Sequence, residues 1–477
     1  MKITRIRLKD FRAFKGEYDI DLNKGRNLLL YGENGSGKSS LFQALNLFFA
    51  PATPFLSNRN LFVTTDDGYV KLEIQDGTNP SQIYEWEQTT HPSTEPVIAE
   101  ASKTKGFLDY RALLETHFVH RHVDSVNVFE LLLNALLPNT RNPITNIAFK
   151  DEWESIQQLV RKRPSSKRNE QLRSLLKDFN DGLINVLNSL TTQANTILAL
   201  FDQELSIKLT LPGRGVSVKP RGKTFENEVV QLTVTYYGQP LVDHHHFLNE
   251  ARLSAIAISI YLAALLLNPP SQLRMLFLDD LLIGLDTCNR LPVLDVLAQF
   301  FSDWQIILAT FDRVWFEMAW QRVKGAKTWE RAELHCARTN EGEVPVYQGN
   351  TEYLVVASQH LVSNDLKAAA IYIRSAYELA LKGFCDKFGL SVRYHDNPKD
   401  QKSEEFWHVV KAQKRKDGTP ILPPALVTDI ELYRSSVLNK LSHTAPVNLI
   451  RKEVEEAFNT VGKMRDELGR ITRADLA

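Results

Sequence analysis

Eight consecutive residues carry the clearest chemistry in this 477-residue chain, and they read Gly32-Glu33-Asn34-Gly35-Ser36-Gly37-Lys38-Ser39. They fit the pattern G-x-x-x-x-G-K-S/T. Glycines let backbone N–H groups turn inward around phosphate oxygens, and the N-terminus of a following helix adds positive potential. A solvent-facing Lys38 would reach the β- and γ-phosphates, and the Ser39 hydroxyl would bind Mg²⁺. We therefore predict a nucleoside triphosphate site at residues 32–39, with Ser40 as a further ligand.

The flanking sequence supplies the elements that must position this loop. The apolar run 28–31 is typical of a buried strand, and residues 40–48 have the pattern of a helix. A strand, a glycine-rich loop and a helix in this order are the context that the motif needs. This context favours a phosphate-binding loop over a chance glycine-rich turn.

Two acids follow a second apolar run. Leu276-Phe277-Leu278 leads directly into Asp279 and Asp280. Asp279 would hold magnesium through water, and Asp280 stands where the general base for an attacking water is expected. The alternative is a surface acid pair that caps a strand.

The order of these motifs resembles ATP-binding-cassette (ABC) ATPases of the SMC/RecF/OLD-like branch. The resemblance covers about residues 1–325. Residues 6–14 and 31–40 resemble the opening of that branch, residues 248–254 its signature, residues 284–286 its D-loop and residues 307–312 its H-loop strand. It implies ATP and Mg²⁺ as cofactors, with nucleotide contacts from Asn249, Glu250 and Asp286.

Several positions depart from the pattern of that family. Asn249 replaces the usual signature serine, Asp280 the usual glutamate and Phe311 the usual histidine switch. No Q-loop glutamine is evident, and His120 or His122 lies near its place. We therefore predict nucleotide binding with slow hydrolysis.

In the family that the chain resembles, two subunits sandwich two ATP molecules. This implies a homodimer or a higher homo-oligomer that closes on ATP. Only 210 positions lead from Lys38 to Leu248, so the very long coiled coils of true SMC proteins do not fit.

These patterns predict an α/β P-loop ABC ATPase head with an inserted helical hairpin, a short coiled coil, and an all-α C-terminal domain. We expect an N-terminal ATPase lobe at residues 1–150, the hairpin at 151–203, a C-terminal ATPase lobe at 204–330 and the helical domain at 331–477.

Cations gather where the hairpin should turn, and they are Arg161, Lys162, Arg163, Lys167 and Arg168. Such a group could contact a nucleic-acid phosphate backbone. A solvated hairpin tip is the alternative, because runs of charge are commonly solvated.

The helical domain bears a loose resemblance to HEPN-type domains, whose ribonuclease motif pairs an arginine with a histidine. Arg434, Asn439 and His443 are the matching residues, but eight residues separate Arg434 from His443, which departs from the usual spacing. The alternative is a polar network inside a helical bundle.

Composition narrows the function further. The formal net charge is zero, so a nucleic-acid contact must come from a local patch. Three scattered cysteines argue against a disulfide framework, and no apolar run is long enough to cross a bilayer. We expect a cytoplasmic protein without a membrane partner.

ATPases with helical tails resemble parts of bacterial anti-phage systems, including PARIS-type and RloC-like ATPases. The resemblance implies a sensor and scaffold that controls an effector nuclease from a neighbouring gene, with DNA or a phage protein as trigger. One alternative is an ATPase-gated HEPN-like ribonuclease toxin. Another is a RecF-like DNA repair or recombination ATPase.

Overall fold

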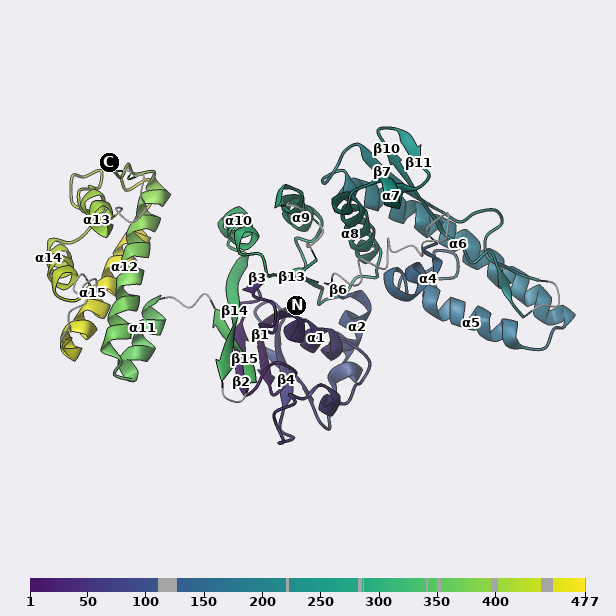
Figure 1. Cartoon of the computed structure of the whole chain (residues 1–477), viewed down its shortest axis with the longest axis horizontal. Helices are drawn as coiled ribbons and strands as arrows, with labels where there is room; N and C mark the ends of the chain where they lie inside the picture. Colours follow the sequence, from purple (N-terminus) through teal and green to yellow (C-terminus); the bar gives the residue numbers. More distant parts are fainter. Residues whose placement is uncertain are drawn as a thin grey trace. The chain divides into compact units, whose positions relative to one another are not determined.

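The computed structural model describes residues 1–109, 127–219, 223–281, 285, 287–339, 342–349, 353–393, 395, 402–438 and 449–476. The chain divides into two compact units, residues 1–349 and 350–477 (Figure 1). Each unit has its own hydrophobic core.

A six-stranded sheet forms the centre of the first unit. Its spatial order is β15 (Gly342–Gly349), β14 (Trp329–Thr339), β3 (Asn27–Gly32), β13 (Gln305–Thr310), β12 (Met275–Asp279) and β6 (Gly106–Asp109). All neighbours pair in parallel except β14 and β15, which are antiparallel. The carboxyl ends of β3, β13 and β12 therefore meet at one edge, where ligands of open parallel sheets bind.

Both faces of this sheet are buried, which explains its continuous apolar strands. Leu28 and Leu30 belong to a core shared with an antiparallel sheet and α1 (Lys38–Phe48). Leu29 belongs to a second core, which continues into the arm described below. The same alternation places Phe277 in the first core and Leu278 in the second.

The antiparallel sheet has the order β2 (Glu17–Asp21), β1 (Lys2–Lys9), β4 (Tyr69–Gln75) and β5 (Gln82–Glu87). Its inward side chains pack in the core that contains α1, so the helix lies between two layers of strands.

The other elements of this unit are shorter helical segments. They are η1 (Phe55–Asn58), η2 (Pro92–Thr94), α2 (Pro96–Thr104), α4 (Phe129–Leu131), η3 (Leu132–Leu136), α7 (His244–Phe247), α9 (Thr287–Phe300), α10 (Arg313–Val323) and η4 (Lys324–Ala326).

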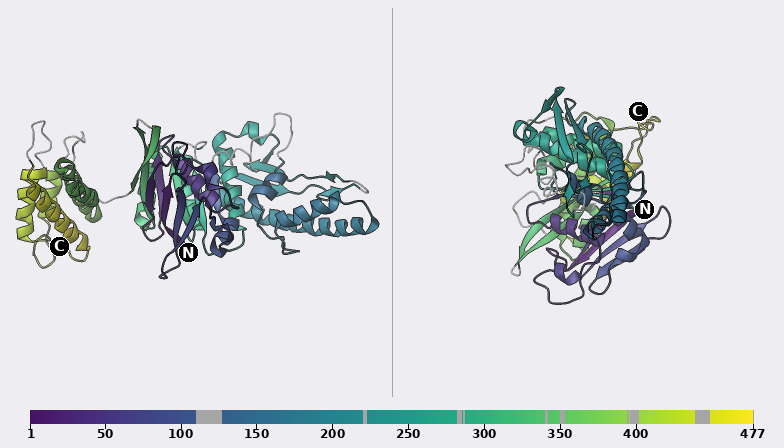
Figure 2. Two further views of the ribbon diagram at one scale, coloured as in Figure 1. Left: turned by 90° about the horizontal axis from the view of Figure 1, so that it is seen from below. Right: turned by 90° about the vertical axis from the view of Figure 1, so that its right-hand side faces the viewer.

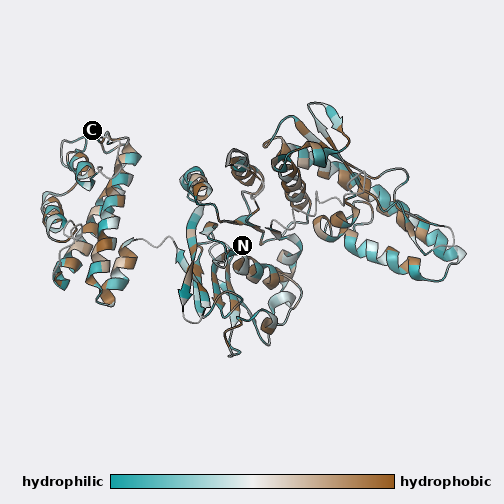
Figure 3. Ribbon diagram, viewed as in Figure 1, coloured by the Kyte–Doolittle hydropathy of each residue, from teal (hydrophilic) through white to brown (hydrophobic). Residues whose placement is uncertain are grey.

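An arm of two helices extends from the six-stranded sheet within the first unit (Figure 2). The helices are α5 (Phe149–Arg161) and α6 (Ser166–Leu198). Strands β7 (Leu205–Thr210), β10 (Gln231–Tyr236) and β11 (Gln239–Leu241) form a sheet at the base of the arm, and β8 (Ser217–Val218) pairs with β9 (Phe225–Glu226). Helix α8 (Glu250–Leu266) packs on α6 and is apolar along most of its length (Figure 3). It therefore joins the arm to the parallel sheet through one core.

The second unit is helical. It contains α11 (Tyr353–Val362), α12 (Leu366–Phe388), α13 (Ser403–Lys411), α14 (Pro424–Tyr433), η6 (Arg434–Leu438) and α15 (Arg451–Arg470). The Asp365 side chain accepts the Ala368 N–H and caps α12, which ends at Gly389 with a φ of 63°. Apolar residues at helical spacing, such as Val454, Val461 and Leu468, fill its core.

The structure corrects one expectation about these elements. The first unit extends to residue 349, beyond the expected boundary at 330, because β14 joins β3 and β15 pairs with β14. Residues 106–109 form β6, a strand that was not among the elements predicted above. Within the described part of the chain, no helix is long and apolar enough to cross a bilayer.

Candidate nucleotide site

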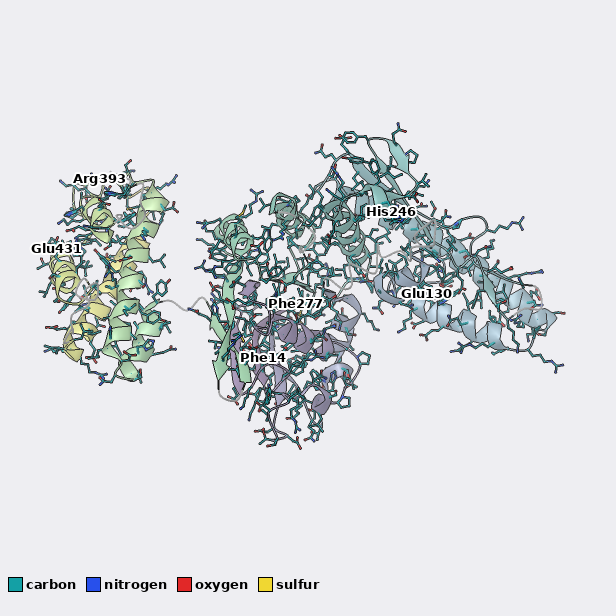
Figure 4. All side chains as sticks on the ribbon, viewed as in Figure 1. Phe14, Glu130, His246, Phe277, Arg393 and Glu431 are labelled. Atoms are coloured by element: carbon teal, nitrogen blue, oxygen red, sulfur yellow. The ribbon has the colours of Figure 1, made fainter. Side chains whose placement is uncertain are left out.

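The glycine-rich loop connects β3 to α1 at the carboxyl edge of the parallel sheet. Gly35 has a φ of 85° and Gly37 a φ of 103°, conformations that favour glycine. A Cβ on Gly37 would also lie 2.8 Å from Cγ of Pro345 in β15 and 3.4 Å from the Phe14 ring, which is labelled in Figure 4. The tight loop therefore depends on glycine for both its conformation and its packing.

Lys38 is the first residue of α1, and its side chain is only 4% exposed. Its Nζ donates to the carbonyl oxygens of Gly32 at 2.6 Å and Glu33 at 3.2 Å. It also lies 3.3 Å from Oδ2 of Asp280. The expectation that Lys38 faces solvent is therefore wrong: the ammonium group is buried among three oxygen partners, where a phosphate would have to compete for it.

Ser39 and Asp279 are joined directly. The Ser39 hydroxyl donates to Oδ2 of Asp279 at 2.8 Å. Asp279 is 4% exposed, and its buried Oδ1 has no hydrogen-bond partner in the described part of the chain. Burial, opposed in part by the Ser39 hydrogen bond, raises the pKa of Asp279 to about 6.

Asp280 lies between the loop and the end of β13. Its φ is 49°, a left-handed conformation that is costly for a residue with a Cβ. Two hydrogen bonds hold it there: its N–H donates to the Ala309 carbonyl at 3.2 Å, and its Oδ1 accepts the Phe311 N–H at 2.9 Å. Burial raises the pKa of its carboxyl, against the effect of the Lys38 ammonium. Such strain concentrates at functional sites.

A cavity of about 350 Å³ opens beside these groups and is lined by Arg12, Ser39, Ser40, Phe42, Gln43, Asp109, Asp279 and Asp280. Three polar residues of this lining were not among the ligands predicted from the sequence: Arg12, Gln43 and Asp109. Asp109 ends β6 and pairs in register with Asp279, so a strand prediction there would have revealed it. The Arg12 guanidinium donates to Oδ1 of Asn58 at 2.9 and 3.1 Å, which fixes it at the cavity wall.

The oxygen atoms of Ser39 and Asp279 fit a magnesium ion that takes its remaining ligands from phosphate and water. Among the described residues, no group of three or more His, Cys, Asp or Glu side chains forms a ligand set. Magnesium is commonly bound by one or two protein oxygens together with phosphate and water. The orphaned Oδ1 of Asp279 and the neighbouring Ser39 hydroxyl match that description.

A comparison with family models agrees with this geometry at the N-terminal end of the chain. Residues 1–208 match the model of an AAA ATPase domain. The match includes the glycine-rich loop at residues 32–39 and stops before the strand that carries Asp279. A comparison with curated proteins finds no match.

Solved structures similar to this chain include three SMC head domains. An Smc head bound to the C-winged helix domain of ScpA has 13% identity and a TM-score of 0.42, covering 74% of this chain and 100% of its own. An Smc head with an extended coiled coil, bound to the C-terminal domain of ScpA derived from Pyrococcus furiosus, has 10% identity, a TM-score of 0.41, and covers 75% and 99%. The SMC head from Thermotoga maritima has 12% identity, a TM-score of 0.36, and covers 72% and 98%. These values are too low to transfer a property to this chain.

The signature residues lie at the N-terminus of α8, away from the described lining of the nucleotide cavity. Asn249 and Glu250 are exposed, and Oδ1 of Asn249 caps α8 by accepting the Arg252 N–H at 3.0 Å. The Arg252 guanidinium pairs with Asp202 at 3.0 Å and lies over the Tyr236 ring. The N-terminus of α8 is thus fixed to the base of the arm.

Some sequence predictions lie outside the described residues. They are the D-loop residue Asp286, the Q-loop candidates His120 and His122, and the ribonuclease candidates Asn439 and His443. Leu285, the middle residue of the predicted D-loop, lies within the described part of the chain. Its carbonyl oxygen accepts a hydrogen bond from Nε–H of Arg290 at 2.6 Å, and Arg290 pairs with Asp312 at 2.6 Å.

The cations predicted at the hairpin tip do not form one group. Arg161, Lys162, Arg163 and Lys167 are exposed around the turn between α5 and α6. Arg168 is 5% exposed and donates to the carbonyl oxygens of Leu159 at 3.2 Å and Val160 at 2.6 Å. Its inclusion among phosphate contacts is therefore wrong, because its guanidinium closes the C-terminus of α5.

Arg434 is the described member of the ribonuclease set. Its Nη2 donates to Glu404 at 2.9 Å, which joins the start of η6 to α13. Tyr377, a buried core residue, lies near the guanidinium, and burial raises its pKa. The described contacts of Arg434 are those of a polar network within the helical unit.

Proposed function

We propose that residues 1–349 bind ATP with Mg²⁺ and hydrolyse it slowly. One observation carries the proposal: two contacts, Ser39 to Asp279 and Lys38 to Asp280, join the glycine-rich loop to the acidic strand beside one cavity. This brings a cation, a hydroxyl and two carboxylates to the carboxyl edge of a parallel sheet, the arrangement that phosphoryl transfer requires.

Each residue has a distinct role in this proposal. Backbone N–H groups of residues 33–39 and the Lys38 ammonium hold the phosphates, and Ser39 and Asp279 hold the metal. When bound, Mg²⁺ would neutralise charge on the phosphate oxygens. Asp280 orients the attacking water and accepts its proton. Hydrolysis is slow because the Asp280 carboxylate is one methylene shorter than a glutamate and is held by Lys38 and the Phe311 N–H.

We further propose that ATP closes a homodimer. Asn249 and Glu250 are exposed and do not line the described cavity of their own chain, so a γ-phosphate contact by these residues would come from a second copy. Asp286 would contribute at the same interface. A phosphate bridging two surfaces stabilises the closed state more than the open one, as a switch requires.

For the cellular role we propose a sensor and scaffold in bacterial anti-phage defence. Closure would control an effector nuclease encoded by a neighbouring gene, in response to DNA or a phage protein. This role is supported by the resemblance of the motif order and helical tail to PARIS-type and RloC-like ATPases. A ribonuclease role for the helical unit and a RecF-like repair role remain the alternatives to be separated by experiment.

The ATPase proposal is tested with purified full-length protein. ATP affinity, phosphate release and molar mass are measured with and without ATP and Mg²⁺, for the wild type, Lys38→Ala and Asp280→Asn. We expect the wild type to bind ATP and to double its mass with ATP, most completely in Asp280→Asn. Normal ATP binding by Lys38→Ala would refute the site, and a constant mass would refute closure.

The defence role needs its own test. The protein is co-expressed with the product of the neighbouring gene, and association is followed with Mg²⁺ and either ATP or ADP. We expect a complex whose stability differs between the two nucleotides. A wild type that binds ATP but shows no nucleotide-dependent association would refute effector control while leaving the ATPase in place.

A further inference from the structure

A second cavity, of about 310 Å³, lies on the arm. One wall is the side of α6 that runs from Arg168 to Asp181, and the other is the segment 214–219. It shares no lining residue with the nucleotide cavity. We call this cavity, with its α6 wall and its 214–219 wall, the arm groove.

The arm groove is held in shape by a buried amide. Asn180 of α6 is 8% exposed, and it accepts the Val216 N–H at 3.0 Å and donates to the Val216 carbonyl at 2.9 Å. Gly215 has a φ of 75°, and a Cβ there would lie 2.7 Å from the Asn180 side chain. The second wall is therefore clamped to the helix, so a ligand meets a formed groove with little ordering cost.

The floor of the arm groove is aliphatic and consists of Leu172, Leu176, Val216 and Val218. Leu172, Leu176 and Val216 are buried, and Val218 is half-buried. The described lining contains no aromatic side chain on which a base could stack.

The rim of the arm groove is cationic. Arg173, Lys177 and Arg214 are exposed, and none of them forms an ion pair with a described residue. Lys219 pairs with Glu226 at 3.4 Å, and Asp181 is the acidic member of the lining. Because the whole chain has a formal net charge of zero, this local excess of positive charge belongs to the groove and not to a general field.

We propose that the arm groove binds a short segment of a partner protein in which aliphatic residues alternate with Asp or Glu. Carboxylates would pair with the unpaired cations of the rim, and aliphatic side chains would cover the floor, the apolar-centre and polar-rim arrangement of protein interfaces. The inference goes beyond the ATPase and does not rest on it.

The aliphatic floor of the arm groove favours a peptide over a nucleic acid as its ligand. A phosphate backbone needs cations but gains nothing from a row of aliphatic side chains. Bases bind exposed strands chiefly by stacking on aromatic rings. A cavity of about 310 Å³ is at the small end of ligand sites, which suits a few side chains.

The test uses immobilised full-length protein and a phage-displayed library of random short peptides. Enriched peptides are synthesised with a fluorescent label, and their affinities are measured by anisotropy. We expect enrichment of sequences that combine Asp or Glu with Leu, Ile or Val, and mutual competition among them. No enrichment of such sequences would overturn the proposal.

A matched pair of charge reversals locates the binding. Arg173→Glu with Lys177→Glu changes two rim cations, whereas Lys162→Glu with Arg163→Glu makes the same charge change at the nearby tip. We expect at least about a tenfold loss of affinity in the first pair and little change in the second, because like charges repel across a contact. Equal losses of peptide affinity in both pairs would mean that the peptides respond to the overall charge of the protein, which would refute binding in the arm groove.

Two more measurements close the test. Val218→Asn removes part of the floor without changing charge, and we expect a several-fold loss of peptide affinity with unchanged thermal stability. Labelled single-stranded and duplex DNA are titrated in parallel. DNA binding that is lost in the rim variant, with peptide affinity unchanged in both rim and floor variants, would assign the groove to nucleic acid instead.

Discussion

The first unit holds two groups of cations in opposite environments. Lys38 is buried, with three oxygen partners within 3.3 Å. Arg173 and Lys177 are exposed on the rim of the arm groove and have no ion-pair partner among the described residues. A buried charge interacts strongly with the few groups around it, so removing it lowers the stability of the fold and also changes the chemistry of the site. Exposed charges act through complementarity with a partner and are screened by salt.

Among the substitutions that test this contrast between buried and exposed cations, Lys38→Ala should have the largest effect. It should abolish detectable ATP binding and also lower the free energy of unfolding by about 1–3 kcal/mol, because it leaves the half-buried Asp280 carboxylate without its cation. Titration calorimetry and thermal denaturation measure the two effects. The control is Lys167→Ala, which removes an exposed cation and should change neither quantity.

Asp280→Asn separates chemistry from binding at the same edge. Asparagine tolerates the left-handed conformation at this position better than alanine does. ATP affinity should be retained, and turnover should fall by about 10² to 10⁴, the usual range for loss of a general base. If phosphate release is unchanged, the base lies elsewhere, with Asp279 as the first residue to test.

The pH dependence of stability tests how strongly Asp279 is buried. Its pKa is raised from 3.8 to about 6, so the folded state holds the proton more tightly than the unfolded chain. Stability from this group is therefore present below about pH 4 and is lost as the pH rises to about 6, by at most about 3 kcal/mol. Asp279→Asn should be more stable than the wild type at neutral pH and lack this loss. A wild type and variant with parallel profiles, measured by denaturant unfolding, would contradict it.

Arg168 and Lys167 are adjacent cations at the arm tip, and their substitution should affect stability very differently. Arg168→Gln should destabilise the first unit by about 1–3 kcal/mol, because two carbonyl oxygens at the end of α5 lose their donor. Lys167→Gln should change stability by less than about 0.5 kcal/mol, as exposed substitutions usually do. Urea titration followed by circular dichroism measures both. Equal effects would mean that the Arg168 bonds contribute nothing.

The weakest expected effect concerns DNA. Arg161, Lys162, Arg163 and Lys167 changed together to Gln should flatten the salt dependence of any duplex binding, by about 0.9 in log–log slope for each lost phosphate contact. Arg168 is left intact so that the fold is preserved. An unchanged slope in fluorescence titrations over a range of salt would identify the tip as a solvated surface.

The sequence predicted the central elements because their signals are local. The run 28–31, the glycine pattern and the paired acids after Leu278 each depend on a few neighbouring residues, and the strands and loop form at those positions. What no local pattern contains is pairing across the chain. β14 joins the sheet by pairing with β3, about 300 residues earlier, and β15 joins it by pairing with β14. The short β6 is defined by its pairing with β12.

The sequence also could not predict the surroundings of individual side chains. Lys38 and Arg168 occur in polar stretches, and each is buried because the fold of its own loop or turn directs its side chain onto carbonyl oxygens a few residues earlier, which residue type alone does not show. Asp109 was missed for another reason: it reaches the site only when β6 pairs with the distant β12. Asp280 could be located from sequence, whereas its left-handed backbone and its contact with Phe311 could not.

The β14–β15 hairpin also determines where this chain can be cut. A truncation after residue 330 would remove nearly all of both strands and leave β3, the strand of the phosphate loop, as a bare edge. Unpaired edges of this kind recruit strands from other molecules, so such a fragment should aggregate during expression. A cut after Gly349 keeps Pro345 on the outer strand, where a proline cannot donate a hydrogen bond to an incoming chain. The hairpin thus protects the protein's solubility as well as completing its sheet.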